Sequence, residues 1–284
     1  MCVFYPDKLC AFKIQPIHMK TPSLLSFAIA TAMLLFLNAC RHTHGESTPD
    51  EPFSIPPKLQ KAFRSDTEFQ EFKYNAAGRI IQYISQWQYV ISDPTQVQRI
   101  ENTFEYNTAG QLIRVNSNRG FHDYYYKNGM LERIESFSGG RLISTTYLKF
   151  TAKGQVSERE EVTPEAHQQP DSPSKTKWVY TYDSKSNCTH VDYFLFLKNQ
   201  YELYEKTDYS GFDNNYNPLN LVAFYPYVPS ALFHINNPTT AVTTSAATGV
   251  QTITRFGYQY NEKGIPISKT TTYHNEPNTL HFQY

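Results

Sequence analysis

Apolar and polar residues alternate along much of the chain beyond residue 61. The alternation is clearest at residues 178–182, where Trp, Tyr and Tyr occupy every second position, and at residues 191–197. Successive side chains of a β-strand point to opposite faces of a sheet, so each stretch places its apolar side chains on one face. Apolar residues do not recur at helical spacing over more than about ten residues. The pattern therefore predicts a protein built from half-buried strands.

A short unit recurs within this pattern: aromatic, any residue, aromatic, then Asn or Asp, with Gly three residues later. The clearest copies are Phe72–Ile80, Phe104–Leu112 and Tyr258–Pro266. Asn and Asp readily begin tight turns, and Gly adopts the positive φ that such a turn needs at its end. Each unit therefore predicts a hairpin. The predicted turn residues are Asn75, Gly78, Asn107, Gly110, Gly129, Gly154, Asp183, Asn261 and Gly264.

Weaker copies of the unit begin at Tyr124, Leu148, Tyr180 and Phe212. In the last two, Ser186 and Tyr216 stand in place of the glycine, so we expect other turns there. With the return turns between units, the chain predicts roughly 14 to 16 antiparallel strands in a long meander. The predicted fold is all-β, a twisted and curled open sheet over residues 62–284.

Two segments interrupt the strands. Residues 161–176 contain Pro164, Pro170 and Pro173 and predict a long exposed loop. Leu219–Asn237 is apolar and rich in proline without strand alternation, and we expect it to cover the concave face of the sheet or to form the wall of a cleft.

The N-terminal region predicts export. Met19-Lys20 is followed by an apolar stretch, Leu24–Leu37, which is shorter than the ~20 residues of a transmembrane helix. We interpret residues 1–39 as a signal peptide whose translation starts at Met19. The ending Leu37-Asn38-Ala39-Cys40 resembles a bacterial lipobox, and this resemblance implies that Cys40 becomes the lipid-modified N-terminus. Residues 40–61 are polar and proline-rich and predict a flexible tether.

The composition excludes some partners. Lys+Arg and Asp+Glu each number 26, so no net charge attracts nucleic acid, and none is expected as a partner. Aromatic residues make up 15% of the chain, which suits pleated sheets and also surfaces that stack on sugars. Among the four cysteines, Cys188 alone lies beyond Cys40, so the body of the chain contains no disulfide pair.

The residues with chemical potential favour structural roles. Cys188 and His190 are two positions apart and are expected on one strand face, where nothing would activate the thiol. His122, His167, His190, His234, His274 and His281 lack the spacing of metal ligands. Asp213-Asn214-Asn215 lacks a calcium-loop pattern, and the carboxylates between Glu158 and Glu161 suit a solvated face. We therefore expect no catalytic, cofactor-binding or metal residues and no enzyme activity.

The order of the units resembles two groups of bacterial proteins. Tyr-x-Tyr-Asn/Asp-x-x-Gly is similar to the YD repeats of Rhs-type proteins, although seven units are too few for a toxin-enclosing shell. Phe212–Pro218, the proline-rich stretch that follows, Asn236-Asn237 and the final Tyr258–Gly264 unit resemble a family of Bacteroidota lipoproteins of unknown function. The resemblance covers residues 67–284 and implies a β-repeat fold on a membrane tether.

Three functions follow as hypotheses. The first is a non-enzymatic envelope lipoprotein that binds a glycan, peptide or protein. The second is a lipid or lipoprotein carrier, which an apolar cavity of several hundred Å³ would favour. The third is a hydrolase with dispersed residues, which a polar cluster with shifted pKa values would favour. We expect attachment to the outer membrane, facing the periplasm rather than the cell surface, since residues 41–46 lack a surface-export pattern.

Overall fold

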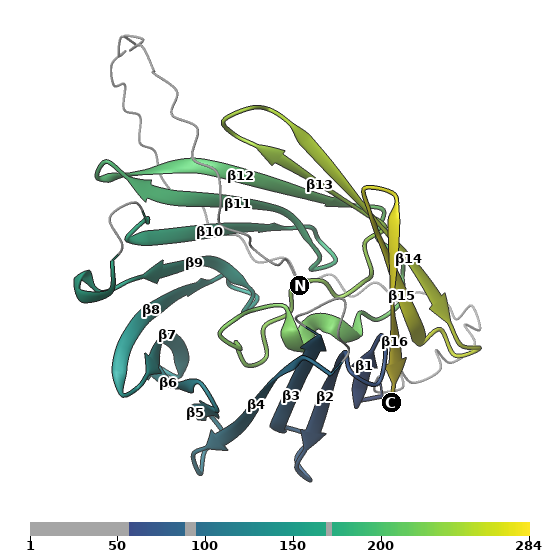
Figure 1. Ribbon diagram of the computed structural model, residues 1–284, viewed down its shortest axis with the longest axis horizontal. Coiled ribbons are helices and arrows are strands. Elements are labelled where there is room, and N and C mark those ends of the chain that lie inside the picture. Colours follow the sequence, from purple (N-terminus) through teal and green to yellow (C-terminus); the bar gives the residue numbers. More distant parts are fainter. Residues whose placement is uncertain (1–56, 89–94, 169–171) are drawn as a thin grey trace, which may run out of the picture. The chain divides into compact units, whose positions relative to one another are not determined.

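The computed structural model describes residues 57–88, 95–168 and 172–284. The predicted signal peptide, Cys40 and the tether up to residue 56 lie outside the described residues. The remainder forms one antiparallel sheet that closes on itself (Figure 1). Its sixteen strands are β1 Lys61–Phe63, β2 Phe69–Tyr74, β3 Ile80–Gln88, β4 Val97–Tyr106, β5 Leu112–Ser117, β6 Gly120–Lys127, β7 Met130–Ser138, β8 Arg141–Phe150, β9 Val156–Val162, β10 Lys175–Tyr182, β11 Cys188–Leu197, β12 Gln200–Ser210, β13 Thr240–Ser245, β14 Gln251–Tyr260, β15 Pro266–Tyr273 and β16 Glu276–Gln283.

Helical structure in the described ranges is limited to two short 3₁₀ helices, η1 Glu165–His167 and η2 Pro218–Val222. The first lies in the predicted exposed loop between β9 and β10, and the second lies between β12 and β13. No helix within the described ranges is long and apolar enough to cross a membrane.

The antiparallel meander and the number of strands confirm the sequence prediction, but the open sheet is wrong. Strand β1 pairs with β2 on one side and with β16 on the other, and this joins the two ends of the meander into a closed barrel. Closure pairs residues 61–63 with residues 281–283, and this part of the sheet edge is therefore not open to pairing with another chain. The prediction missed it because β1 has three residues, Lys-Ala-Phe, too few to show alternation next to a polar segment.

Side chains alternate between the inside and the outside of the barrel. The first residue of most units, such as Phe72, Phe104 or Tyr180, is buried in a single core cluster. The intervening position points outward and is often charged, as at Lys149, which pairs with Glu158 at 2.8 Å. In these units the alternation read from the sequence therefore places the aromatic residue inside and the polar residue outside.

The turns have the local geometry that the units predict. The Oδ1 atom of Asn75 accepts a hydrogen bond from the backbone N of Arg79 at 3.0 Å, and Gly78 has a φ of 77°. The same side-chain bond recurs four residues after Asn107, Asp183 and Asn261, at 2.9, 2.8 and 3.0 Å. The glycines Gly110, Gly154 and Gly264 likewise have positive φ.

Three turns depart from this scheme. Ser186 adopts a φ of 68° and so preserves the turn without glycine. Asn128 and Gly129, with φ of 51° and 79°, form a tight two-residue turn typical of hairpins. Tyr216 is not part of a hairpin: its unit leads into the interior of the barrel, where Tyr216 forms an isolated bridge with Asn236.

A row of tyrosine hydroxyls links neighbouring units. The second aromatic residue of a unit donates its hydroxyl to the carbonyl two residues after the preceding turn glycine, as Tyr106 does to Ile80 at 2.7 Å and Tyr126 to Leu112 at 3.0 Å. Tyr182 and Tyr284 repeat the bond to Val156 and Pro266. Tyr74 donates to Leu59 in the same way. These bonds fix each hairpin against the next one.

One member of this row lacks the hydroxyl, and this permits a two-way test. Arg133 of β7 lies opposite Tyr147 of β8. Continuing this register by two residues brings Leu131 opposite Lys149 and Phe150 next to Leu131, as Tyr106 is next to Ile80. We expect Tyr106→Phe to lower the free energy of unfolding by about 1 kcal/mol and Phe150→Tyr to raise it by a similar amount. Urea unfolding followed by tryptophan fluorescence measures both changes. Equal losses in the two variants would contradict a row of hydroxyl bonds.

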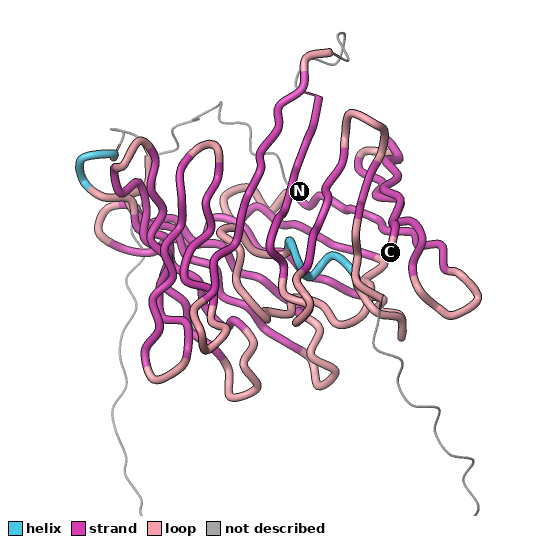
Figure 2. The backbone as a smooth tube through the Cα atoms, turned by 90° about the horizontal axis from the view of Figure 1, so that it is seen from below, coloured by secondary structure: helices cyan, strands magenta, loops and turns pink. Residues whose placement is uncertain are grey.

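The segment between β12 and β13, residues 211–239, enters the barrel, and we call it the plug. Figures 1 and 2 show its helix η2 within the ring of strands. Tyr124 donates its hydroxyl to the carbonyl of Tyr227 at 2.8 Å, and the backbone N of Cys188 donates to Phe233 at 2.9 Å. Phe224 meets the Tyr180 ring edge to face at 5.6 Å. The predicted covering segment therefore lies on the inner face of the sheet.

Candidate functional site

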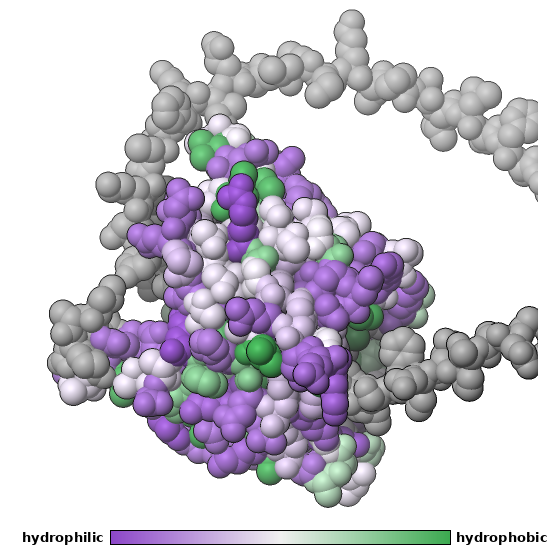
Figure 3. Space-filling model, turned by 90° about the vertical axis from the view of Figure 1, so that its right-hand side faces the viewer, coloured by the Kyte–Doolittle hydropathy of each residue, from purple (hydrophilic) through white to green (hydrophobic). Residues whose placement is uncertain are grey.

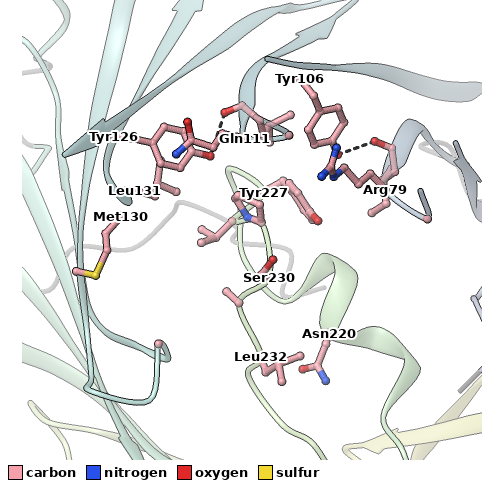
Figure 4. A pocket seen from close by; sticks show the side chains of 18 of the residues that line it. Arg79, Tyr106, Gln111, Tyr126, Met130, Leu131, Asn220, Tyr227, Ser230 and Leu232 are labelled. Atoms are coloured by element: carbon pink, nitrogen blue, oxygen red, sulfur yellow. Dashed lines mark hydrogen bonds between the residues drawn. The ribbon is translucent and has the colours of Figure 1, made fainter. Parts of the chain in front are cut away.

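A cavity of about 540 Å³ lies between the plug and the hairpin turns of the first units (Figure 4). The strands and turns contribute Tyr74, Gly78, Arg79, Ile80, Tyr106, Gly110, Gln111, Leu112, Tyr126, Gly129, Met130, Leu131, Phe150 and Gly154. The plug contributes Tyr216, Asn220, Tyr227, Val228, Pro229, Ser230, Ala231 and Leu232. Both expectations for Leu219–Asn237 therefore hold, because the segment covers the sheet and also forms one wall of a cleft.

The wall formed by the strands consists of the second aromatic residue of successive units. Tyr74, Tyr106, Tyr126 and Phe150 line the cavity. The three tyrosine hydroxyls are already bonded to backbone carbonyls, so the wall presents rings rather than free hydroxyl groups. Burial raises the pKa of Tyr106 to about 12, which keeps its phenol neutral. The wall therefore suits an apolar or flat ligand.

The opposite wall is held in place by a buried amide. The Oδ1 atom of Asn220 accepts hydrogen bonds from the backbone N of Phe233 and of His234, each at 3.0 Å. These bonds span the loop that carries Val228 to Leu232 into the cavity. On the same loop Tyr227 meets Phe104 edge to face at 5.3 Å. The Asn220 bonds therefore fix this loop within the plug, and the Tyr227–Phe104 contact joins it to the barrel.

The mouth of the cavity carries positive charge. Arg79 is the charged residue in the lining, which contains no Asp or Glu among the described residues. Its guanidinium lies 5.7 Å from the centre of the Tyr106 ring. Figure 4 shows the two side chains next to each other. Lys58 lies 5.4 Å from the centre of the neighbouring Tyr74 ring. Both cations are held over aromatic faces rather than against carboxylates.

A second polar group inside the barrel bears on the hydrolase hypothesis. His122 Nδ1 lies 2.8 Å from Ser136 Oγ, and His122 Nε2 lies 3.5 Å from the hydroxyl of Tyr225. Burial lowers the pKa of His122 to about 4, so the ring is a neutral and weak base. Neither ring nitrogen contacts a carboxylate in the described part of the chain, and Ser136 is 3% exposed. The group therefore lacks the third member and the access of a nucleophilic site.

The expected placement of Cys188 and His190 on one face is wrong. A bulge shifts the register between β10 and β11, so that Tyr182 faces Cys188 but Thr181 faces His190. Cys188 is therefore fully buried inside, and burial raises its thiol pKa to about 12. His190 points outward and binds Asp208 at 2.6 Å and Asp192 at 2.9 Å. The pair cannot act together.

The outward histidine makes stability depend on pH. Burial alone would lower the pKa of His190, but hydrogen bonds with Asp208 and Asp192 outweigh it and raise the pKa above 6.5. A raised pKa in the folded state contributes stability below the unfolded value, and this is lost as pH rises through the folded value. We expect His190→Gln to destabilise the barrel most near pH 5 and progressively less above about pH 6.5. The test measures the urea unfolding midpoints of the parent protein and of His190→Gln from about pH 5 to above pH 6.5. A difference between the two midpoints that does not change with pH would contradict this prediction.

The acidic residues have structural partners. Glu158 pairs with Lys149, Glu160 accepts from the Tyr201 hydroxyl, and Glu161 lies 2.9 Å from Arg159 on the inner face. Asp213 accepts hydrogen bonds within the plug and from β14. In the ranges that the structure describes, no group of three or more His, Cys, Asp or Glu residues could hold a metal ion.

The sequence located part of the site. Four of the predicted turn glycines, Gly78, Gly110, Gly129 and Gly154, come together at the mouth of the cavity. The other predicted turn residues lie in their turns outside the lining. Arg79, Met130 and Leu232 were not singled out, although the position immediately after each turn glycine is the signal that would have indicated the first two. Leu232 has no comparable local signal.

Comparisons with known proteins support the architecture. The chain is similar to the crystal structure of a porin-like protein from Bacteroides vulgatus ATCC 8482, with a TM-score of 0.55 and 11% identity over 80% of this chain and 99% of the other. A porin-like protein from Bacteroides uniformis ATCC 8492 gives a TM-score of 0.53 and 12% identity over 81% and 98% of the two chains. No protein-family model and no curated protein matches the sequence. At these identities the likeness shows the fold alone, which is a closed antiparallel barrel.

Proposed function

We propose that the chain is a membrane-tethered, non-enzymatic binding protein of the cell envelope that takes a small, largely apolar ligand into the cavity beside the plug. The cavity carries this proposal: its volume of about 540 Å³ falls in the range of small-molecule sites, and its lining is mostly aromatic and aliphatic. The tyrosine hydroxyls are already bonded to backbone carbonyls, so they offer little to a glycan. Among the three hypotheses, the carrier of an apolar ligand has the most support.

The outer surface supports a barrel that stands in water. Membrane-spanning barrels turn an apolar band toward the lipid and keep polar groups inside. Here the outward positions include ion pairs such as Arg114–Asp123 at 2.6 Å, while the core aromatic residues, such as Phe72 and Phe104, point inward. Figure 3 shows a mainly hydrophilic face with scattered apolar residues. The lipid on Cys40, rather than the strands, would then hold the protein to the outer membrane, with the barrel in the periplasm.

A substitution that fills the cavity tests the proposal. Leu232 lines the cavity and is 40% exposed, and Leu203 on β12 is equally exposed outside it, so Leu203→Trp is a matched control for Leu232→Trp. We expect native mass spectrometry of the full chain, released from detergent micelles, to detect bound 1-dodecanol. Leu232→Trp should weaken that binding at least about tenfold, which corresponds to about 1.4 kcal/mol. Equal binding by both variants, or no binding by the parent protein, would overturn the proposal.

A further inference from the structure

We propose that Arg79 binds the anionic group of the ligand, so that the cavity takes an amphipathic molecule with an apolar body and a carboxylate or phosphate head. This inference rests on the proposed function and specifies the class of ligand. It is carried by the charge of the lining, by the way the guanidinium is positioned, and by the order of polar and apolar groups from the mouth inward.

The first observation is an uncompensated charge. Arg114 and Arg133 on the outer surface are each 2.6 to 2.9 Å from a carboxylate. Arg79 forms no ion pair within the described residues, and the cavity that it lines contains no carboxylate there. An arginine presents planar paired donors that match a carboxylate or a phosphate. The site is therefore complementary to an anion and not to a cation.

The second observation is that the guanidinium is positioned before any ligand binds. It lies against the backbone of Gly110, where a Cβ atom would overlap it, and beside the Tyr106 ring. Gly110 therefore serves two purposes, the positive φ of the turn and the space for the arginine of the preceding unit. Lys58 lies against Gly78 in the same way. Restricting the side chain in advance reduces the entropy lost on binding.

The third observation is the arrangement of the lining. Arg79 is exposed at the mouth, whereas Leu131 and Val228 are buried in the core cluster. Figure 4 places Tyr227 and Leu131 on facing walls of the same space. A ligand would leave its charged head in partial contact with water and bury its apolar part among rings and aliphatic side chains. Acyl chains with an acidic head have this form.

The test compares ligands that share a body and differ in the head. Full-length protein is titrated with dodecanoate, dodecyl phosphate and 1-dodecanol, and bound ligand is measured by native mass spectrometry. We expect Arg79→Gln to weaken dodecanoate or dodecyl phosphate binding about fivefold and to leave dodecanol unchanged. Raising ionic strength from about 0.1 M to 1 M, which shortens the Debye length from about 10 Å to 3 Å, should weaken only the anionic ligands.

Arg141→Gln is the control, since Arg141 begins β8 after an exposed turn and does not line the cavity. It should leave all three affinities unchanged. The two acidic ligands differ only in the head, so whichever binds more tightly identifies the preferred anion. Binding of dodecanol and the acids with no effect of Arg79→Gln would overturn the anion site but keep the proposed function. Failure of every ligand to bind would overturn both.

Discussion

Asp213→Ala should lower the free energy of unfolding by about 3 kcal/mol and release the plug from the barrel wall. The Oδ1 atom of Asp213 accepts hydrogen bonds from the backbone N of Asn215 at 2.9 Å and of Asn237 at 3.0 Å, and Oδ2 accepts from the Tyr260 hydroxyl. Removing the carboxylate takes the acceptor away from the backbone N–H of Asn237, a fully buried residue. Urea unfolding measures the loss, and hydrogen exchange in the plug reports its release.

Two variants delimit this prediction. Asp213→Asn retains an acceptor oxygen and should lose about half as much. Asp66→Ala, at an exposed position, should change stability by less than about 0.5 kcal/mol. Unaltered hydrogen exchange of the plug in Asp213→Ala would show that other contacts hold the plug in the barrel.

The Asp213 carboxylate also makes the stability of the barrel depend on pH in the acid range. Burial alone would raise the pKa of Asp213, but the hydrogen bonds from Tyr260, Asn237 and Asn215 outweigh it and lower the pKa below 3.8. A lowered pKa in the folded state contributes stability above the unfolded value and loses it as pH falls through the folded value. The difference in the free energy of unfolding between the parent protein and Asp213→Ala should therefore decrease as the pH falls below about 3.8.

Phe233→Ala should destabilise the barrel by about 3 to 4 kcal/mol, because it removes a plug ring that packs against three other aromatic rings. That ring meets Tyr180 at 6.0 Å, Tyr209 at 5.6 Å and Phe224 at 5.8 Å, all nearly edge to face. Differential scanning calorimetry should show a lower midpoint of thermal unfolding. Dodecanol binding should also weaken, because the plug forms one wall of the cavity.

Phe233→Leu preserves most of the volume and should lose less than half as much. Val250→Ala, 63% exposed in a turn, should be neutral. An unfolding midpoint of Phe233→Ala equal to that of the parent protein would contradict this prediction. The plug would then be held in the barrel by its backbone hydrogen bonds and not by aromatic packing.

The hairpins were predictable because their causes are local. Asn75, Gly78 and the aromatic pair before them lie within seven residues, and the turn bonds join positions four apart. The same is true of Ser186, which keeps the turn because its neighbour Asp183 supplies the side-chain oxygen. Local chemistry therefore fixed the repeat and its strand direction.

The cavity depends on contacts that no local pattern contains. Tyr124 meets Tyr227 across 103 residues, and Asn187 meets Asn236 across 49. The plug was recognisable as an apolar interruption that covers the sheet, but the residues of the strands that it contacts were not. A single bulge at Tyr182 also reversed the face of His190 relative to Cys188, which a strict alternation of two cannot anticipate.

The three-residue pairing of β1 with β16, which we call the seam, also constrains the order in which the strands fold. Residues 61–63 must find residues 281–283, near the other end of the described chain, whereas every other strand contacts its sequence neighbour. Loop-closure entropy grows with the length of the chain between two contacts, and non-local pairing is slow. The hairpins should therefore form early and the seam last, so the curled sheet with two free edges is the expected penultimate state on the folding pathway. Until the seam forms, β1 and β16 each present an unpaired edge to other chains, and aggregation during folding should concentrate there.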